Sequence, residues 1–341
     1  MKKFLPLIVL TAAMVTGISA AADDEVAEFT RHKHLVELVT SQGCAYCPWG
    51  DRVLEQLAEI RPDIARVSIH NNLNASDQFR TFKADAIGNL LKYDAMPEAA
   101  FDRTPYQGVF MQVVSVPPEY SQAKAQAFSD QLDTNVTTPV LADVVIDADY
   151  DQATRKLTVT VSGDIKSNFF STFGTAANST GLTIYLTEDS LVAWQQDGPT
   201  RVEDFVHNNV FRETMTNYKG DALMWNDEKT HYQNTYAYTL KAGWVPENMN
   251  IVAFVHRSTG TTPVQEVINC QSMAIRDLLE QPVEPVPGDV DGNGSVGIED
   301  VNAVINVMLG AAQNPAADVD AGGSVGIEDV NAVINIMLGK R

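Results

Sequence analysis

The sequence predicts a multidomain α+β protein: an α/β domain, then a strand-rich domain, then a small all-α module. Apolar strand patterns alternate with helical segments in residues 30–134, and strand patterns dominate residues 138–280. The last 54 residues repeat one loop and one amphipathic helix. About 320 residues would remain after removal of an export signal, which is more than one hydrophobic core normally holds.

Residues 1–21 are predicted to be a secretory signal peptide. Lys2 and Lys3 precede an apolar run from Phe4 to Ile18, and the small residues Ser19–Ala22 provide a cleavage site. Further along the chain, the sequence contains no segment with the length and apolarity of a membrane span. We therefore expect a secreted protein.

The charge of the chain restricts its partners. The formal net charge is −20, and it becomes −22 once the two lysines of the signal peptide are removed. A strongly acidic protein is repelled by nucleic acid and by anionic membranes, so we expect neither as a partner. The same charge suits an exported protein that collects calcium.

A CxxC motif in the first domain lies where a strand is predicted to run into a helix. Cys44 and Cys47 follow the apolar strand Leu35–Val39, and Pro48 suits a first helical turn because its missing N–H would have no partner there. The amino end of a helix favours a thiolate. Cys44 would then be the nucleophile and Cys47 the resolving thiol.

These residues resemble those of thioredoxin-like domains. The resemblance implies that Pro97, which precedes the strand Glu98–Phe101, is a cis-proline beside the redox pair that shapes a peptide groove. It also suggests Glu37 as a buried proton acceptor, although Glu37 stands seven residues before Cys44 rather than six.

Two interpretations of the cysteine pair stay open. One is a thiol-disulfide oxidoreductase that acts on protein thiols through Cys44 and Cys47. The other is a permanent disulfide in an oxidising compartment, on a fold kept as a binding scaffold. Zinc is disfavoured because the chain has no second cysteine pair. The remaining cysteine, Cys270, is predicted to be a buried hydrophobe on the same strand face as Ile268.

The second domain, residues 138–280, is predicted to be a β-sandwich. Its apolar segments include Leu157–Val161, Leu182–Leu186, Tyr236–Leu240 and Ile251–Val255. His207 has no nucleophile partner in the sequence pattern, so we expect a hydrogen-bonded loop histidine.

The stretch from His34 to Ala274 resembles the outer-membrane-protein-twenty-eight family of Bacteroidetes. The resemblance is carried by LVELVTSQGCAYCPWG, MPEAAFDR, YDQATRKLTVTVS and VHNNVFR. It implies a thioredoxin-like domain followed by a sandwich, exported to the cell envelope or outer-membrane surface. It implies no particular reaction.

Residues 288–341 contain one unit twice, with a period of 29 residues. Each copy has carboxylates on alternate positions, a glycine at the sixth and a carboxylate at the twelfth, the layout of an EF-hand-type calcium loop. The predicted ligand positions are Asp289, Asp291, Asn293, Ser295, Gly297 and Asp300 in the first copy, and Asp318, Asp320, Ser324, Gly326 and Asp329 in the second.

The second calcium site is expected to be the weaker one, because Gly322 at its fifth position has no side-chain oxygen. So short a module buries little core, and calcium should supply on the order of 3 kcal/mol per site at a hundredfold excess over its dissociation constant. The alternative, a solvated acidic tail, would not explain the helical spacing of apolar residues in both copies.

The module resembles a type I dockerin. The proline-rich linker, residues 281–287, forbids a helix before the first loop, so each unit is a loop followed by a helix. The resemblance implies two calcium ions and a cohesin-bearing partner, usually in polysaccharide-degrading assemblies. Positions 10 and 11 are Ile298–Glu299 and Ile327–Glu328, not the Ser-Thr pair of many dockerins. The partner is therefore either cohesin-like or another exported protein.

Overall fold

The computed structural model describes residues 27–71, 77–135, 138–258, 266–279 and 286–340. The predicted signal peptide and most of the predicted linker lie outside these residues. Within the part of the chain that is described, no helix is both long and apolar enough to cross a membrane. The structure has the mixed α+β character that the sequence predicts.

The amino-terminal region is built on a parallel β-α-β unit. β1 (His34–Thr40) leads into α1 (Cys47–Ile60), which returns the chain to β2 (Ile64–His70), and the two strands pair in parallel. The antiparallel strands β3 and β4 then extend the sheet beyond β1. The other elements of this region are α2 Phe82–Leu91, β3 Glu98–Phe101, β4 Gln112–Val113, η1 Pro118–Tyr120 and α3 Ser121–Asn135.

The two faces of this sheet are covered by different elements. Val36 and Leu38 of β1 pack in one apolar cluster with residues of α1 and α3. Leu35 and Val39 pack in another, with residues of α2 and of the strand-rich region. This alternation follows from the two-residue period of a strand, and it decides which β1 side chains can reach the cysteine pair.

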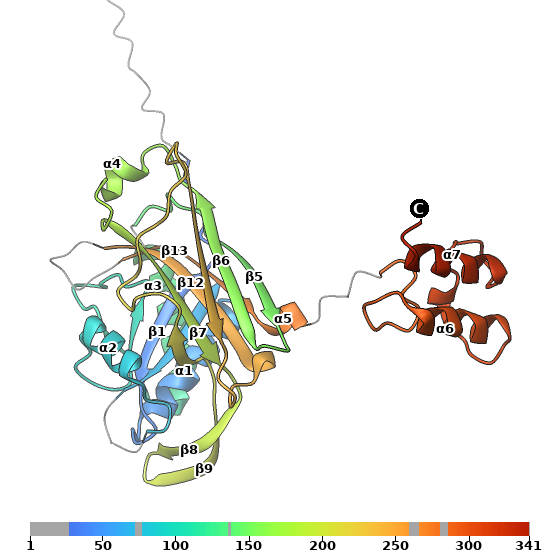
Figure 1. Ribbon diagram of the computed structural model, residues 1–341. Helices are drawn as coiled ribbons and strands as arrows, with labels where there is room; N and C mark the ends of the chain where they lie inside the picture. The colour runs from blue at the N-terminus through green and yellow to red at the C-terminus, as the bar shows by residue number, and fades with distance from the viewer. Residues whose placement is uncertain (1–26, 72–76, 136–137, 259–265, 280–285, 341) are drawn as a thin grey trace, which may run out of the picture.

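The sequence predicts separate sheets for the two regions, but the structure joins them. One eight-stranded sheet has the order β13-β12-β7-β10-β2-β1-β3-β4. Its strands β1, β7, β12 and β13 are labelled in Figure 1. The junction is a short parallel pairing at Ser68 and Val210, where the Ser68 amide donates to the Asn209 carbonyl at 2.7 Å. The strands contributed by the second region are β7 Thr180–Glu188, β10 Val210–Thr214, β12 Met249–Arg257 and β13 Val267–Ala274.

The predicted sandwich is present in the second region, with one of its sheets shared. A three-stranded sheet of order β11-β6-β5 packs on β7 and β12 through a large apolar cluster. Leu157, Val159 and Val161 alternate inward along β6, as their spacing predicts. The remaining elements are β5 Val145–Asp151, β6 Lys156–Asp164, α4 Phe169–Phe173, β11 His231–Thr239, η2 Pro246–Asn248 and α5 Arg276–Leu279.

A separate two-stranded hairpin projects from the second region toward α1. Its strands are β8 (Leu191–Asp197) and β9 (Thr200–His207), and it lies at the α1 end of the molecule (Figure 1). Nothing in the sequence pattern predicts that this hairpin reaches the cysteine motif, about 150 residues earlier in the chain.

Cys270 is fully buried, as expected, but it faces the opposite way from Ile268. Cys270 packs in the cluster with α2, whereas Ile268 packs in the sandwich cluster. The pairing of β12 with β13 shifts register between Val255 and His256, which leaves Ile268 unpaired. One extra residue breaks the strict alternation.

The carboxyl-terminal module contains two loop-helix units. α6 (Ile298–Met308) and α7 (Ile327–Met337) pack around Val301, Val304, Val330 and Val333, and the short η3 (Pro315–Ala317) connects them. Met308 and Met337, at the ends of the two helices, are 38% and 39% exposed.

Candidate functional sites: a covered disulfide and two acidic loops

Cys44 and Cys47 form a disulfide at the start of α1. Cys47 is the first residue of the helix and is fully buried, and Cys44 is 4% exposed. The position at the amino end of a helix agrees with the expected geometry. The burial of Cys44 differs from what an openly accessible nucleophile would show.

Pro97 lies beside the disulfide. The Met96–Pro97 peptide bond is cis, and the Cys44 Sγ lies 3.7 Å from the Met96 carbonyl oxygen. Helix α1 approaches Pro97 closely: a Cβ added at Gly50 would stand 2.8 Å from the Pro97 Cγ. The structure thus brings together the three residues singled out around the CxxC motif, Cys44, Cys47 and Pro97.

Glu37 does not serve as the proton acceptor suggested by its position in the sequence. It alternates with Val36 and Leu38, so its side chain lies on the sheet face opposite α1. There its carboxylate accepts hydrogen bonds from Arg103 at 2.7 and 2.8 Å and from the Tyr185 hydroxyl at 3.2 Å. Burial alone would lower the pKa of Arg103, but Glu37 raises it above its usual value.

The β8–β9 hairpin is hydrogen-bonded to the loop that carries the cysteines. Gln195 is 1% exposed, and its Nε2 donates to the carbonyls of Ser41 at 3.2 Å and Cys44 at 3.1 Å. The Gly198 amide donates to the Ala45 carbonyl at 2.8 Å.

Gln42 adds two hydrogen bonds to the same contact, one as an acceptor and one as a donor. Its carbonyl accepts from the Gln196 amide at 2.8 Å, and its Nε2 donates to the Trp194 carbonyl at 2.7 Å. The hairpin therefore holds the β1–α1 loop along its length. Sequence reasoning missed these residues, because no local pattern links Gln42 to a strand in another region.

The first acidic loop gathers three of its predicted ligands. Carboxylate oxygens of Asp289, Asp291 and Asp300 lie within 4.8 Å of one another. Asn293 and Ser295 are exposed in the same loop, and the Asn293 Oδ1 accepts from the Ser295 hydroxyl at 2.6 Å.

Asp300 is buried and held by backbone donors. Burial raises the pKa of its carboxyl, but hydrogen bonds from the amides of Gly297, Asp291 and Val290 outweigh burial and hold the pKa below its usual value. The bond from Gly297, at 2.8 Å, also caps α6. This carboxylate thus closes the loop and starts the helix.

The second loop repeats the arrangement with two differences. Carboxylate oxygens of Asp318, Asp320 and Asp329 lie within 4.8 Å of one another, and Ser324 is exposed nearby. Gly322 provides no side-chain oxygen, as the sequence shows. In addition, Ala321 has a φ of 56°, whereas its counterpart in the first copy is Gly292 with a φ of 75°. An alanine is strained in this left-handed region.

Residues 119–277 match the model of the family described as Outer membrane protein Omp28. The chain resembles Omp28 proteins over that span. The matched segment runs from η1 to α5, so it includes β5–β13 and excludes the cysteine pair and both acidic loops. The match confirms the predicted location at the cell envelope or outer-membrane surface.

Two solved structures from Porphyromonas gingivalis are similar to this chain. HBP35 superimposes with a TM-score of 0.57 and 17% sequence identity, over 73% of this chain and 76% of HBP35. A domain of the outer membrane lipoprotein Omp28 gives a TM-score of 0.26 and 22% identity, over 39% of this chain and 87% of that domain. The likeness to HBP35 supports the fold alone. Comparison with curated proteins gives no match.

Proposed function

We propose that this chain is an exported envelope protein whose residues 288–341 form a dockerin-like module that binds two calcium ions. With calcium bound, the module docks the chain to another exported protein, a cohesin-like partner by its resemblance. The observation that carries the proposal is the pair of carboxylate triads, Asp289–Asp291–Asp300 and Asp318–Asp320–Asp329, at matching positions of two loops. Hard, oxygen-rich sites of this kind suit calcium.

The surface of the module supports a docking role. Several large apolar side chains are exposed on so small a unit, which is typical of a surface that a partner covers. The exposed apolar residues occur at equivalent positions of the two repeats: Ile298 and Ile327 are 57% and 56% exposed. Leu309 and Leu338, after the helices, are 72% and 56% exposed. Assembly with enzymes that degrade polysaccharides belongs to this proposal through the dockerin resemblance.

Calcium-dependent capture tests the proposal. The full chain, immobilised, should retain an envelope protein in calcium and release it in chelator. The double variant Asp289→Asn with Asp318→Asn should retain nothing in either condition. Asp204→Asn, an exposed carboxylate of β9, is the matched control and should behave as the parent chain.

Calorimetry on the same proteins separates the two parts of the proposal. The parent chain should take up two calcium ions, the second more weakly. If the parent releases no measurable heat on calcium addition, calcium binding is refuted. If it binds calcium but retains the same proteins in chelator, calcium-dependent docking is refuted.

A second function, thiol-disulfide exchange, is favoured by the position of the cysteine pair. The cis-proline and the disulfide at the start of α1 lie on a parallel β-α-β unit, an arrangement like that of thioredoxin-like domains. A substrate thiolate would attack the Cys44 Sγ, and the Cys44–Cys47 bond would break with Cys47 leaving as a thiolate. A second substrate thiol would then displace Cys44, so that the substrate gains a disulfide and the pair is reduced.

A stoichiometric assay tests this second function. The oxidised chain, mixed with a dithiol peptide, should yield one peptide disulfide per chain. Cys44→Ser, which has no Cys44–Cys47 bond to break, should yield no peptide disulfide, and Cys270→Ser should match the parent. A parent chain that leaves the peptide fully reduced would establish a static disulfide.

A further inference from the structure

A polar cavity lies between α1, β2 and the loops of the second region, on the α1 side of the joined sheet. It has a narrow inner end of about 10 Å³ and a wider outer part of about 360 Å³. Glu55, Arg66 and Asn208 line both parts and therefore stand where the two meet. The outer volume falls in the range of small-molecule sites.

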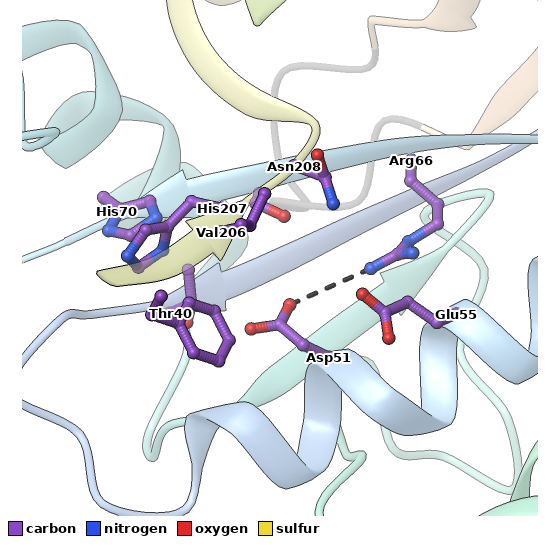
Figure 2. A pocket seen from close by; sticks show the side chains of 10 residues that line it. Thr40, Asp51, Glu55, Arg66, His70, Val206, His207 and Asn208 are labelled. Atoms are coloured by element: carbon purple, nitrogen blue, oxygen red, sulfur yellow. Dashed lines mark ion pairs between the residues drawn. The ribbon is translucent and has the colours of Figure 1, made fainter. Parts of the chain in front are cut away.

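Arg66 is the buried group at the centre of this cavity. Its side chain is 9% exposed, yet its Nε has no hydrogen-bond partner among the described residues. Its ion pair with Asp51 is loose, at 3.8 Å. Figure 2 shows Asp51 and Glu55 pointing from α1 toward the guanidinium. A buried donor without an acceptor costs free energy. We therefore expect the Arg66 Nε to donate to an oxygen of a bound molecule.

The surrounding charges decide which kind of oxygen can approach. Arg66 contributes one positive charge, and Asp51 and Glu55 offer two carboxylates. Burial raises the pKa of Asp51 to about 6, so this group is mostly ionised at neutral pH. Over the whole cavity the acids Asp51, Glu55, Asp189 and Glu247 outnumber the bases Arg66, Arg276 and His70, so an anionic ligand would be repelled. A neutral hydroxyl can accept from Arg66 and donate to Glu55 at the same time.

The outer part is rich in side-chain amides. Asn208, Asn209, Asn248 and Asn250 line it, and each amide offers both a donor and an acceptor. Its charged lining residues, besides Glu55 and Arg66, are Asp189, Glu247 and Arg276. Asp189 is already engaged, because it accepts from the Asn209 backbone amide at 2.6 Å and from the Asn250 Nδ2 at 2.8 Å. In the described part of the chain, sets of three acidic side chains close enough to share a metal ion occur in the two carboxyl-terminal loops.

We propose that this cavity is a binding site for a neutral polyhydroxylated ligand, a mono- or disaccharide, with Arg66, Glu55 and Asn208 as its principal contacts. Alternating donors and acceptors match neighbouring hydroxyl groups. The polar lining offers little to an apolar molecule. The site is independent of both the cysteine pair and the calcium loops.

Saturation-transfer difference NMR on the full chain tests the site. The probes are the methyl glycosides of glucose, galactose, mannose and N-acetylglucosamine, with putrescine and succinate as cationic and anionic competitors. At least one glycoside should bind, and Arg66→Gln and Asn208→Ala should each weaken it about tenfold or more. Glu59→Gln, one turn along α1 from Glu55 and outside the cavity lining, should leave it unchanged.

Three results would each overturn the proposal. They are no signal from any glycoside, a signal that survives the cavity variants, and binding of putrescine or succinate in place of the glycosides. Circular dichroism confirms the fold of each variant. If Arg66→Gln fails to fold, Asn208→Ala and Glu55→Gln decide the question.

Discussion

The side-chain amide of Gln195 donates a hydrogen bond to the carbonyl oxygen of Cys44, 3.1 Å away, from a residue 151 positions later in the chain. A strand of the second region therefore lies directly against the disulfide loop. Because Cys44 is 4% exposed in this arrangement, a protein thiol would need the β8–β9 hairpin to move before it could reach the sulfur.

We predict that Gln195→Ala speeds reduction of the Cys44–Cys47 disulfide several-fold. The change removes the side-chain donor to the carbonyls of Ser41 and Cys44, which keep only the hydrogen bonds from the Cys44 and Cys47 amides. Loss of these two hydrogen bonds weakens the hairpin contact by about 1–3 kcal/mol. The measurement is the rate of thiol release under dithiothreitol. Gln196→Ala is the control, since its backbone amide, not its side chain, holds the loop. Equal rates for the two variants would show that the hairpin does not limit access.

The sequence predicted the immediate surroundings of the disulfide but not what covers it. A strand, a CxxC motif, a helix and a Met-Pro pair are local signals, and the structure brings Cys44 and Pro97 together. The hairpin contact depends on Gln42 and Gln195, whose pairing has no periodic signature. The suggested role of Glu37 as proton acceptor was wrong because adjacent positions of a strand face opposite sides of the sheet, and Glu37 lies on the side away from α1.

The sequence does contain a pattern that indicates the cavity around Arg66. β2 reads IARVSIH, in which Arg66, Ser68 and His70 alternate with apolar residues on a strand that is buried except at the partly exposed Arg66. Asp51 and Glu55 are spaced four residues apart on the helix that faces them. Polar residues along one face of a central strand are therefore a sequence signal of a site.

We predict that Ala321→Gly strengthens the second calcium loop. Glycine relieves the left-handed backbone at this position and should stabilise the loop by about 1 kcal/mol, which corresponds to a several-fold gain in calcium affinity at that site. The reverse change in the first copy, Gly292→Ala, should weaken the first site, because an added Cβ there meets nothing and only the backbone conformation is penalised. Calorimetric calcium titration of the full chain measures both. If neither variant alters either site, backbone strain does not set the difference between them.

We predict that Arg103→Leu destabilises the fold by about 3–5 kcal/mol, since it removes the ion-pair partner of the buried Glu37 and leaves that carboxylate with the Tyr185 hydroxyl alone of its two partners. Urea unfolding followed by circular dichroism gives the free energy. Arg201→Leu is the matched control: it breaks an exposed pair with Glu203, at 2.8 Å, and should cost less than about 1 kcal/mol. Similar losses in the two variants would mean that burial adds nothing to the Glu37–Arg103 pair.

His207 should make the fold less stable in acid. It is 5% exposed and packs edge-on against His70 and Phe79. Burial and the neighbouring His70 lower its pKa from 6.5 to about 4. Between pH 6.5 and 4 the unfolded chain therefore binds a proton that the folded chain does not, so the free energy of unfolding falls as pH falls through this window. The loss is on the order of 3 kcal/mol when complete.

Replacement of the ring isolates this effect. His207→Phe keeps an aromatic contact and removes the titration, so its stability should fall less steeply than that of the parent chain between pH 6.5 and 4. Asp51, with a pKa raised to about 6 by burial, acts in the opposite sense over part of the same window. Asp51 is present in both proteins, so the difference between their urea-unfolding curves at each pH reports His207 alone. Parallel curves would show that His207 titrates alike in the folded and unfolded chains, and that its burial beside His70 carries no electrostatic cost.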